Sequence, residues 1–171
     1  VRGGARFSEH AVLYRMNAQS ASIENVFARS GISYRVIGGM RFYERKEIRD
    51  VLAYLNLINN NSDDIRLRRI INEPKRGIGD TTINHAAEIS SQLGQSLFET
   101  FDNADQFSSL SRAAGKLQEF CNMIKSLTAA ADELSISELL AEVLEKSGYR
   151  VSLMSDADPK TQKDLPMLMN L

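Results

Sequence analysis

Residues 74–82 read Pro-Lys-Arg-Gly-Ile-Gly-Asp-Thr-Thr, and the rest of the chain is organised around this stretch. The glycines on either side of Ile78 allow backbone dihedrals that are closed to other residues. Consecutive N–H groups can therefore converge on an anion at the N-terminus of a following helix, where the helix dipole also favours negative charge. Lys75 and Arg76 add positive charge beside this turn. The stretch predicts a phosphate site, and a nucleic-acid backbone as its ligand.

The turn is expected to join two helices, because Ile70 and Ile71 precede it and Ile83 follows it at helical spacing. In such a helix-hairpin-helix, main-chain amides hold one phosphate, the hydroxyl of Thr81 or Thr82 donates to it, and basic side chains neutralise its neighbours. The alternative is a plain glycine-rich turn with a structural role. The residues predicted to contact phosphate are Lys75, Arg76, Gly77, Ile78, Gly79, Asp80 and Thr81.

The composition is that of an ordinary globular protein of 171 residues, with 43% hydrophobic and 25% charged residues. No apolar run reaches the roughly 18 residues that a membrane span needs, so no membrane partner is expected. A single cysteine, Cys121, excludes an internal disulfide and favours a cytoplasmic location. His10 and His85 lack partners at ligand spacing, so no metal site is predicted. We also find no catalytic nucleophile paired with a base, and expect no catalysis by this chain alone.

The charge is unevenly distributed although the net charge is only −1. Residues 1–83 carry 14 Lys and Arg against 9 Asp and Glu, and residues 84–171 carry 7 against 13. The basic half contains the Gly-Ile-Gly turn, which favours a polyanionic partner there. The acidic half favours a competing hypothesis, a helical module that binds a protein partner and in which the turn is structural.

The first 40 residues follow a different pattern from the rest. Strand-forming residues at 11–14 and 34–37 flank a helix predicted from Ser20 to Ser30, which is the pattern of a βαβ unit. Beyond Gly39 the periodicity is helical throughout, with an apolar stripe at 44–59 and one long or two short helices at 110–134. The fold class expected is therefore mainly α, preceded by a partial α/β unit.

Several helix boundaries can be located from capping patterns. Ser96 with Glu99 and Ser135 with Glu138 have the spacing of capping boxes. Gly94 and Gly148 stand where the preceding helices should stop.

Two further groups of polar residues have both a functional and a structural interpretation. Arg15, Asn17 and Gln19 follow the first predicted strand, where α/β sheets bind ligands, although Asn17 could simply cap the helix. Basic residues also surround Phe42 and Tyr43, an arrangement that binds single strands by charge and stacking but is more often a solvated helix face. The basic residues of that second group are Arg41, Arg45, Lys46 and Arg49.

Three segments together resemble a known family. AVLYRMNAQS at 11–20, YRVIGGMRFYERKEIRDVLAYL at 34–55 and RIINEPKRGIGDTTI at 69–83 are similar to the UvrD/PcrA/Rep group of superfamily 1A DNA helicases, and to its PcrA-like members in particular. The three motifs occur in the order and spacing of that family. Two departures are Ala21, where the family usually has Arg, and the segment 165–171, which differs from the family's last helix.

The resemblance implies a domain division and a set of DNA contacts. Residues 1–42 would be part of the RecA-like motor domain 2A, and residues 43–171 most of the helical domain 2B, incomplete at its C-terminus. Arg15 and Asn17, with Gln19 beside them, would contact single-stranded DNA as part of motif IV. Lys75 to Thr81 would contact duplex DNA ahead of the unwinding junction. Gly38 and Gly39 would form a hinge between the domains.

The resemblance also implies what the chain does in a longer parent protein. The parent would be a 3′-to-5′ DNA helicase of repair or replication that uses ATP and Mg²⁺. The family's Walker A and B motifs are absent from these 171 residues, so we expect no cofactor and no ATP hydrolysis here. Uncovered sheet edges around Val12, Tyr14, Val36 and Ile37 lead us to expect that the isolated piece either forms a dimer or has a poorly ordered N-terminus.

Overall fold

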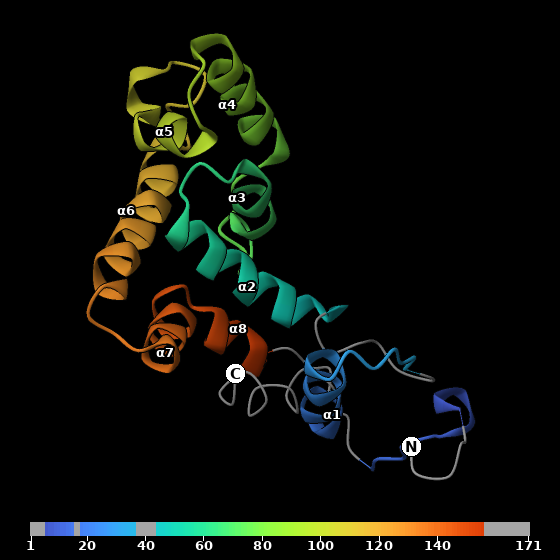
Figure 1. Cartoon of the computed structure of the whole chain (residues 1–171). Coiled ribbons are helices and arrows are strands. Elements are labelled where there is room, and N and C mark those ends of the chain that lie inside the picture. The colour runs from blue at the N-terminus through green and yellow to red at the C-terminus, as the bar shows by residue number, and fades with distance from the viewer. Residues whose placement is uncertain (1–5, 16–17, 37–43, 156–171) are drawn as a thin grey trace. The chain divides into compact units, whose positions relative to one another are not determined.

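A computed structural model describes residues 6–15, 18–36 and 44–155, and these residues are mainly helical, as predicted (Figure 1). The chain divides into two compact units, residues 1–45 and 46–171. The division predicted from the sequence lies at 42/43. Because the positions of the two units relative to one another are not determined, each is described by itself.

The first unit contains a short 3-10 helix, η1 (Phe7–Glu9), and one α-helix, α1 (Ala18–Arg29). Gly31, with φ 65°, ends α1 in a left-handed turn. The chain then folds back onto the helix. The Tyr34 ring lies 5.7 Å from the Phe27 ring, and the Tyr34 hydroxyl donates to the Glu24 carboxylate at 3.1 Å.

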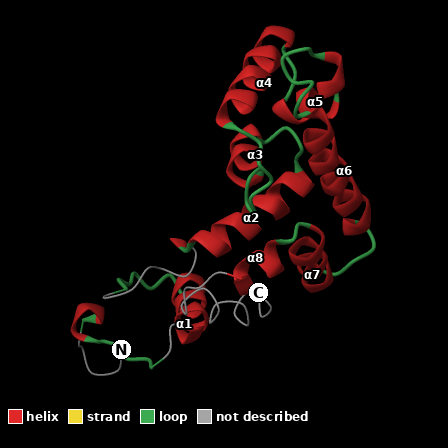
Figure 2. Cartoon of the chain, turned by 180° about the vertical axis from the view of Figure 1, so that it is seen from behind, coloured by secondary structure: helices red, strands yellow, loops and turns green. Residues whose placement is uncertain are grey.

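The two strands predicted at 11–14 and 34–37 are not formed in the part of the chain that the structure describes, which excludes Ile37 (Figure 2). A strand exists only as part of a hydrogen-bonded ladder, and no described residue pairs with either segment through its backbone. Leu13 is 94% exposed and Val12 53% exposed. Their apolar pattern is that of a sheet, but none of the described residues forms a neighbouring strand, so the prediction of a βαβ unit is not confirmed.

The second unit is an assembly of seven α-helices in its described residues. Their bounds are α2 (Lys46–Asn59), α3 (Asp64–Ile70), α4 (Asp80–Leu93), α5 (Leu97–Asp102), α6 (Ala114–Ala131), α7 (Ile136–Lys146) and α8 (Tyr149–Ser155), with a 3-10 turn, η3 (Ala104–Gln106), after α5. Helix α2 packs against α3, α6 and α7, and α5 bridges α4 and α6 (Figure 1).

Within the described residues, one apolar cluster holds α2 to α7 together. Helix α6 forms as one continuous helix and buries Leu117, Phe120, Ile124 and Leu127, the four side chains predicted to face inward. Tyr54 from α2 and Phe101 from α5 are fully buried beside them. Because these helices come from all parts of residues 46–155, the core depends on contacts far apart in sequence.

The predicted helix boundaries are confirmed. Both capping boxes form: the hydroxyl oxygen of Ser96 accepts from the backbone N–H of Glu99, and that of Ser135 accepts from Glu138. Gly94 ends α4 with φ 65°. At Glu138 the hydrogen bonds from Ser135 lower the pKa of the carboxyl, because they stabilise its charged form.

Candidate nucleic-acid interface

The Gly-Ile-Gly turn lies between α3 and α4, as predicted, but its two glycines have different conformations. Gly77 has φ +69°, in the left-handed region that side chains disfavour. Gly79 has φ −72° and ψ 153°, an extended conformation open to any residue, and it is the N-cap of α4. The expectation that both glycines supply unusual dihedrals is therefore correct for Gly77 and wrong for Gly79.

Asn72 closes the turn from the side of α3. Its side-chain amide donates to the carbonyl oxygen of Ile78, and its Oδ1 accepts from the Ile78 N–H at 3.2 Å. The Ile78 side chain is 3% exposed and belongs to the apolar core. Because the Ile78 N–H is already paired, it is not offered to a ligand. Ile78 instead anchors the turn.

The first turn of α4 has backbone donors that no described residue accepts. The N–H groups of Gly79, Asp80 and Thr81 have no acceptor among the described residues, and no side chain caps this helix. Asp80 and Thr81 are both exposed. These N–H groups can therefore hold an anion together with the helix dipole. The Asp80 carboxylate stabilises the same helix end and would repel a phosphate beside it.

Arg76 lies inside the turn instead of facing outward. Its guanidinium donates to the carbonyl oxygens of Ile70 (3.0 Å), Ile71 (3.1 Å), Pro74 (3.2 Å) and Ser147 (3.2 Å) and to the Tyr54 hydroxyl (2.7 Å). It also lies over the Phe120 ring, 5.2 Å from the ring centre. A guanidinium has five N–H donors. The terminal nitrogens of the Arg76 guanidinium already donate to acceptors within the protein. This arrangement does not fit the phosphate contact predicted for Arg76.

The position of Arg76 makes it a brace for the turn. It ties the end of α3 to α2 through Tyr54 and to the end of α7 through Ser147. Burial raises the pKa of the Tyr54 hydroxyl, although the charge of Arg76 acts in the opposite direction. The sequence pattern Lys-Arg-Gly cannot show that the two adjacent basic residues have different roles. Only the packing of α2, α6 and α7 around the turn separates them.

Two lysines flank the turn on the outside. Lys75, one of the predicted contacts, is exposed. Lys116, in the first turn of α6, is also exposed, and its Nζ donates to the carbonyl oxygen of Gly77 at 3.4 Å. Lys116 was not among the predicted contacts, because it lies 39 residues beyond Gly77 in the sequence. An uncapped helix start that contains Lys and no acidic residue was the available signal.

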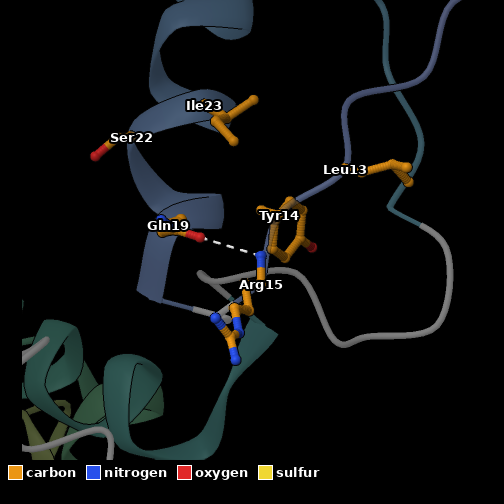
Figure 3. A pocket seen from close by; sticks show the side chains of 6 residues that line it. All are labelled: Leu13, Tyr14, Arg15, Gln19, Ser22 and Ile23. Atoms are coloured by element: carbon orange, nitrogen blue, oxygen red, sulfur yellow. Dashed lines mark hydrogen bonds between the residues drawn. The ribbon is translucent and has the colours of Figure 1, made fainter.

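In the first unit, the predicted contacts Arg15 and Gln19 line a shallow open hollow with Leu13, Tyr14, Ser22 and Ile23 (Figure 3). The backbone N–H of Arg15 donates to Oε1 of Gln19 at 3.1 Å, so Gln19 stabilises the approach to α1. Asn17 and the predicted hinge, Gly38 and Gly39, lie outside the described residues.

The basic and aromatic cluster predicted around Phe42 can be followed only at Arg45, Lys46 and Arg49. Its other members, Arg41, Phe42 and Tyr43, lie outside the described residues. The Lys46 ammonium pairs with Asp50 at 2.8 Å and Glu73 at 2.6 Å. Arg45 is 8% exposed. Among the described members of the cluster, Arg49 alone is exposed and has no described ion pair. A single available cation is too few for a basic strip, so this face favours the structural interpretation.

The described residues also bear on metal binding and on membrane insertion. No three His, Cys, Asp or Glu side chains come together as metal ligands there. None of the described helices is both long and apolar enough to span a membrane.

The sequence matches the model of the UvrD-like helicase C-terminal domain over residues 2–114. It is 42% identical, over 95% of its length, to the ATP-dependent DNA helicase PcrA of Bacillus subtilis. It is 44% identical over 87% of its length to the PcrA of Staphylococcus epidermidis, and 41% over 89% to that of Staphylococcus aureus. The chain spans about a fifth of the length of these relatives, 22%, 20% and 21% respectively.

Proposed function

This chain belongs to the UvrD-like helicase C-terminal domain family, and on that premise we propose that it is a DNA-contacting part of an ATP-dependent 3′-to-5′ DNA helicase. Its relatives are named DNA helicases. In this proposal, ATP and Mg²⁺ are bound by other parts of the whole protein, and the present residues contact and regulate DNA without hydrolysing ATP.

The observation that carries the proposal is the start of α4. The N–H groups of Gly79, Asp80 and Thr81 are exposed donors without a described acceptor, and Lys75 lies on the same turn. Hydrogen bonds made by the side chains of Asn72 and Arg76 hold this turn on its inner side, where Ile78 is buried. A preformed set of donors needs little ordering when a phosphate binds. Contacts of this kind recognise the DNA backbone and not the base sequence.

We assign duplex DNA to this turn and single-stranded DNA to the first unit. Arg15 and Gln19 line an open hollow there, and Asn17 stands between them in sequence. We further infer that residues 11–14 and residues 34–36, the described part of the second predicted strand, become strands when the remainder of a RecA-like sheet supplies their neighbours. The exposure of Val12 and Leu13 supports this inference, because side chains with that pattern are normally covered in a sheet.

The proposal is tested by fluorescence anisotropy with three labelled probes: a blunt duplex, a duplex with a 3′ single-stranded tail, and the single strand alone. We expect the duplex to bind with an affinity that falls steeply with added KCl.

Lys75→Ala should weaken duplex binding and lower the salt slope by about 1. Arg15→Ala should weaken binding of the single strand and of the tailed duplex and leave binding of the blunt duplex unchanged. Asp80→Asn should strengthen duplex binding, because it removes a negative charge beside the phosphate.

The control is Lys125→Ala, which removes the same charge from α6 at a lysine already paired with Asp102 at 2.6 Å. Arg76→Ala is unsuitable as a binding variant, because it removes an internal brace. If no probe binds even at low salt, DNA contact by this chain is contradicted. The competing function, a helical module that binds a protein partner, would then be favoured.

A further inference from the structure

We propose that Lys116 is a second phosphate-binding residue of the same interface, so that duplex DNA is held by residues from both α4 and α6. This inference rests on the proposed function. Its first support is position: Nζ of Lys116 lies 3.4 Å from the carbonyl oxygen of Gly77, the first glycine of the Gly-Ile-Gly turn. Lys75 lies two residues before Gly77 in the sequence, whereas Lys116 belongs to α6 and reaches Gly77 because the helices pack together.

The ion pairing of the described lysines singles out these two. Lys46 pairs with Asp50 and Glu73, Lys125 with Asp102, and Lys146 with Glu142. Lys75 and Lys116 have no ion pair with any described carboxylate. A paired ammonium is already neutralised and adds little attraction for a phosphate, whereas an unpaired one keeps its full charge. The two uncompensated ammonium groups are the two that flank Gly77.

Gly77 leaves room for the Lys116 ammonium. A Cβ built on Gly77 would lie 3.1 Å from the Nζ of Lys116, so the lysine side chain would have to shift slightly to accommodate it. The absence of a side chain at residue 77 therefore lets the ammonium rest against the backbone of the turn.

The chemistry suits a phosphate oxygen. An ammonium carries three N–H donors, of which the Gly77 carbonyl takes one. That hydrogen bond is long, and therefore weak, so the ammonium can exchange it for a phosphate oxygen at little cost. Lysine acts on phosphate as a point charge, and a contact to phosphate carries no sequence information. The contact should therefore add to affinity and to salt dependence equally for all sequences.

The test measures binding of the blunt labelled duplex by the 171-residue chain across a KCl series. Lys116→Ala should weaken binding several-fold at low salt and lower the salt slope by about 1, as expected for the loss of one phosphate contact. Lys116→Arg should bind nearly as well as the unchanged chain. The double variant Lys75→Ala/Lys116→Ala should lower the slope by about 2. Lys125→Ala is the matched control, because it removes the same charge from the same helix.

The outcomes separate this inference from the proposed function. If Lys75→Ala lowers the slope and Lys116→Ala does not, the role of Lys116 is overturned and duplex binding by the turn stands. If Lys116→Ala and Lys125→Ala weaken binding equally, the effect is one of net charge and the inference is again overturned. If the unchanged chain shows no salt-dependent duplex binding, both proposals are overturned. Circular dichroism checks that each variant keeps its helical content.

Discussion

Gly77 has φ +69°, and the Lys116 ammonium lies where its Cβ would point. Gly79, two residues later, has φ −72° and open space where a Cβ would be. The two positions therefore form a matched pair within one turn. Both contribute to a sequence pattern that looks symmetrical, but the backbone is unusual at only one of them.

We expect Gly77→Ala to destabilise the fold by about 1–2 kcal/mol, the cost of placing an L-residue in the left-handed region. Gly79→Ala should cost less than about 1 kcal/mol, because alanine is only a weaker N-cap than glycine. Urea denaturation followed by circular dichroism measures both. Equal losses at the two positions would contradict the difference in backbone conformation.

Arg76 belongs to the same scale, because one side chain satisfies four carbonyl oxygens and a hydroxyl. We expect Arg76→Ala to lower the free energy of unfolding by about 2–4 kcal/mol, since buried carbonyl oxygens lose a charged donor. Arg68→Ala removes an exposed arginine of α3 and should change stability by less than about 0.5 kcal/mol. A stability loss no larger than that of Arg68→Ala would show that the brace contributes little.

At the scale of elements, a buried carboxylate joins three helices. Asp50 of α2 is 1% exposed, forms an ion pair with Arg69 of α3 at 2.7 Å and accepts a hydrogen bond from the Tyr149 hydroxyl of α8 at 2.7 Å. The ammonium of Lys46, one turn earlier in α2, lies 2.8 Å from the same carboxylate. Asp50 is therefore buried, although aspartate is a residue type that rarely is unless it is paired. A carboxylate with three donors can be buried because each donor replaces part of its hydration.

We expect Asp50→Asn to destabilise the chain by about 3 kcal/mol, because it leaves two cations without their buried partner. Asp132→Asn is the control, since Asp132 is exposed and has no described ion pair. The measurement is the urea midpoint of each variant. Hydrogen exchange should also show that α8 opens more readily in Asp50→Asn. Unchanged protection of α8 would contradict the role of Asp50 in holding it.

At the scale of the whole molecule, the core contains groups that are kept protonated. Burial raises the pKa of the Cys121 thiol from 9.0 to about 12. Burial also raises the pKa of the hydroxyls of Tyr54 and Tyr149, and the neighbouring Asp50 carboxylate adds to the shift at Tyr149. All three groups therefore bind their protons more tightly in the folded state than in the unfolded state.

The sign of the pH dependence follows from these shifts. The contribution of Cys121 to stability is complete below the unfolded pKa, near 9.0, and is lost as the pH rises through about 12. The two tyrosines act in the same direction from about pH 10 upward. We expect the urea midpoint to fall continuously above about pH 9. Cys121→Ala should reduce the slope of that fall below pH 10, and a flat profile from pH 7 to 11 would contradict this assignment.

Local elements and the candidate site differed in how far they could be predicted. The capping boxes at Ser96 and Ser135 and the stop at Gly94 were predictable, because a cap is formed by residues within three or four positions of one another. The predicted strands at 11–14 and 34–37 were not confirmed, because pairing depends on a neighbouring strand that no described residue supplies. Lys75 was predictable as an exposed cation, and Lys116 was not.

By itself the sequence determined the mainly helical fold, the position of the Gly-Ile-Gly turn and the helicase family, since helical period, caps and family motifs are all written in residues close along the chain. The tertiary structure alone decided that Arg76 turns inward, that Asp50 is buried and that Lys116 reaches Gly77. These side chains are long or charged, and their partners come from helices up to 99 residues away. Which partner such a group meets is settled only when the helices pack, because its charge must be satisfied wherever water is excluded.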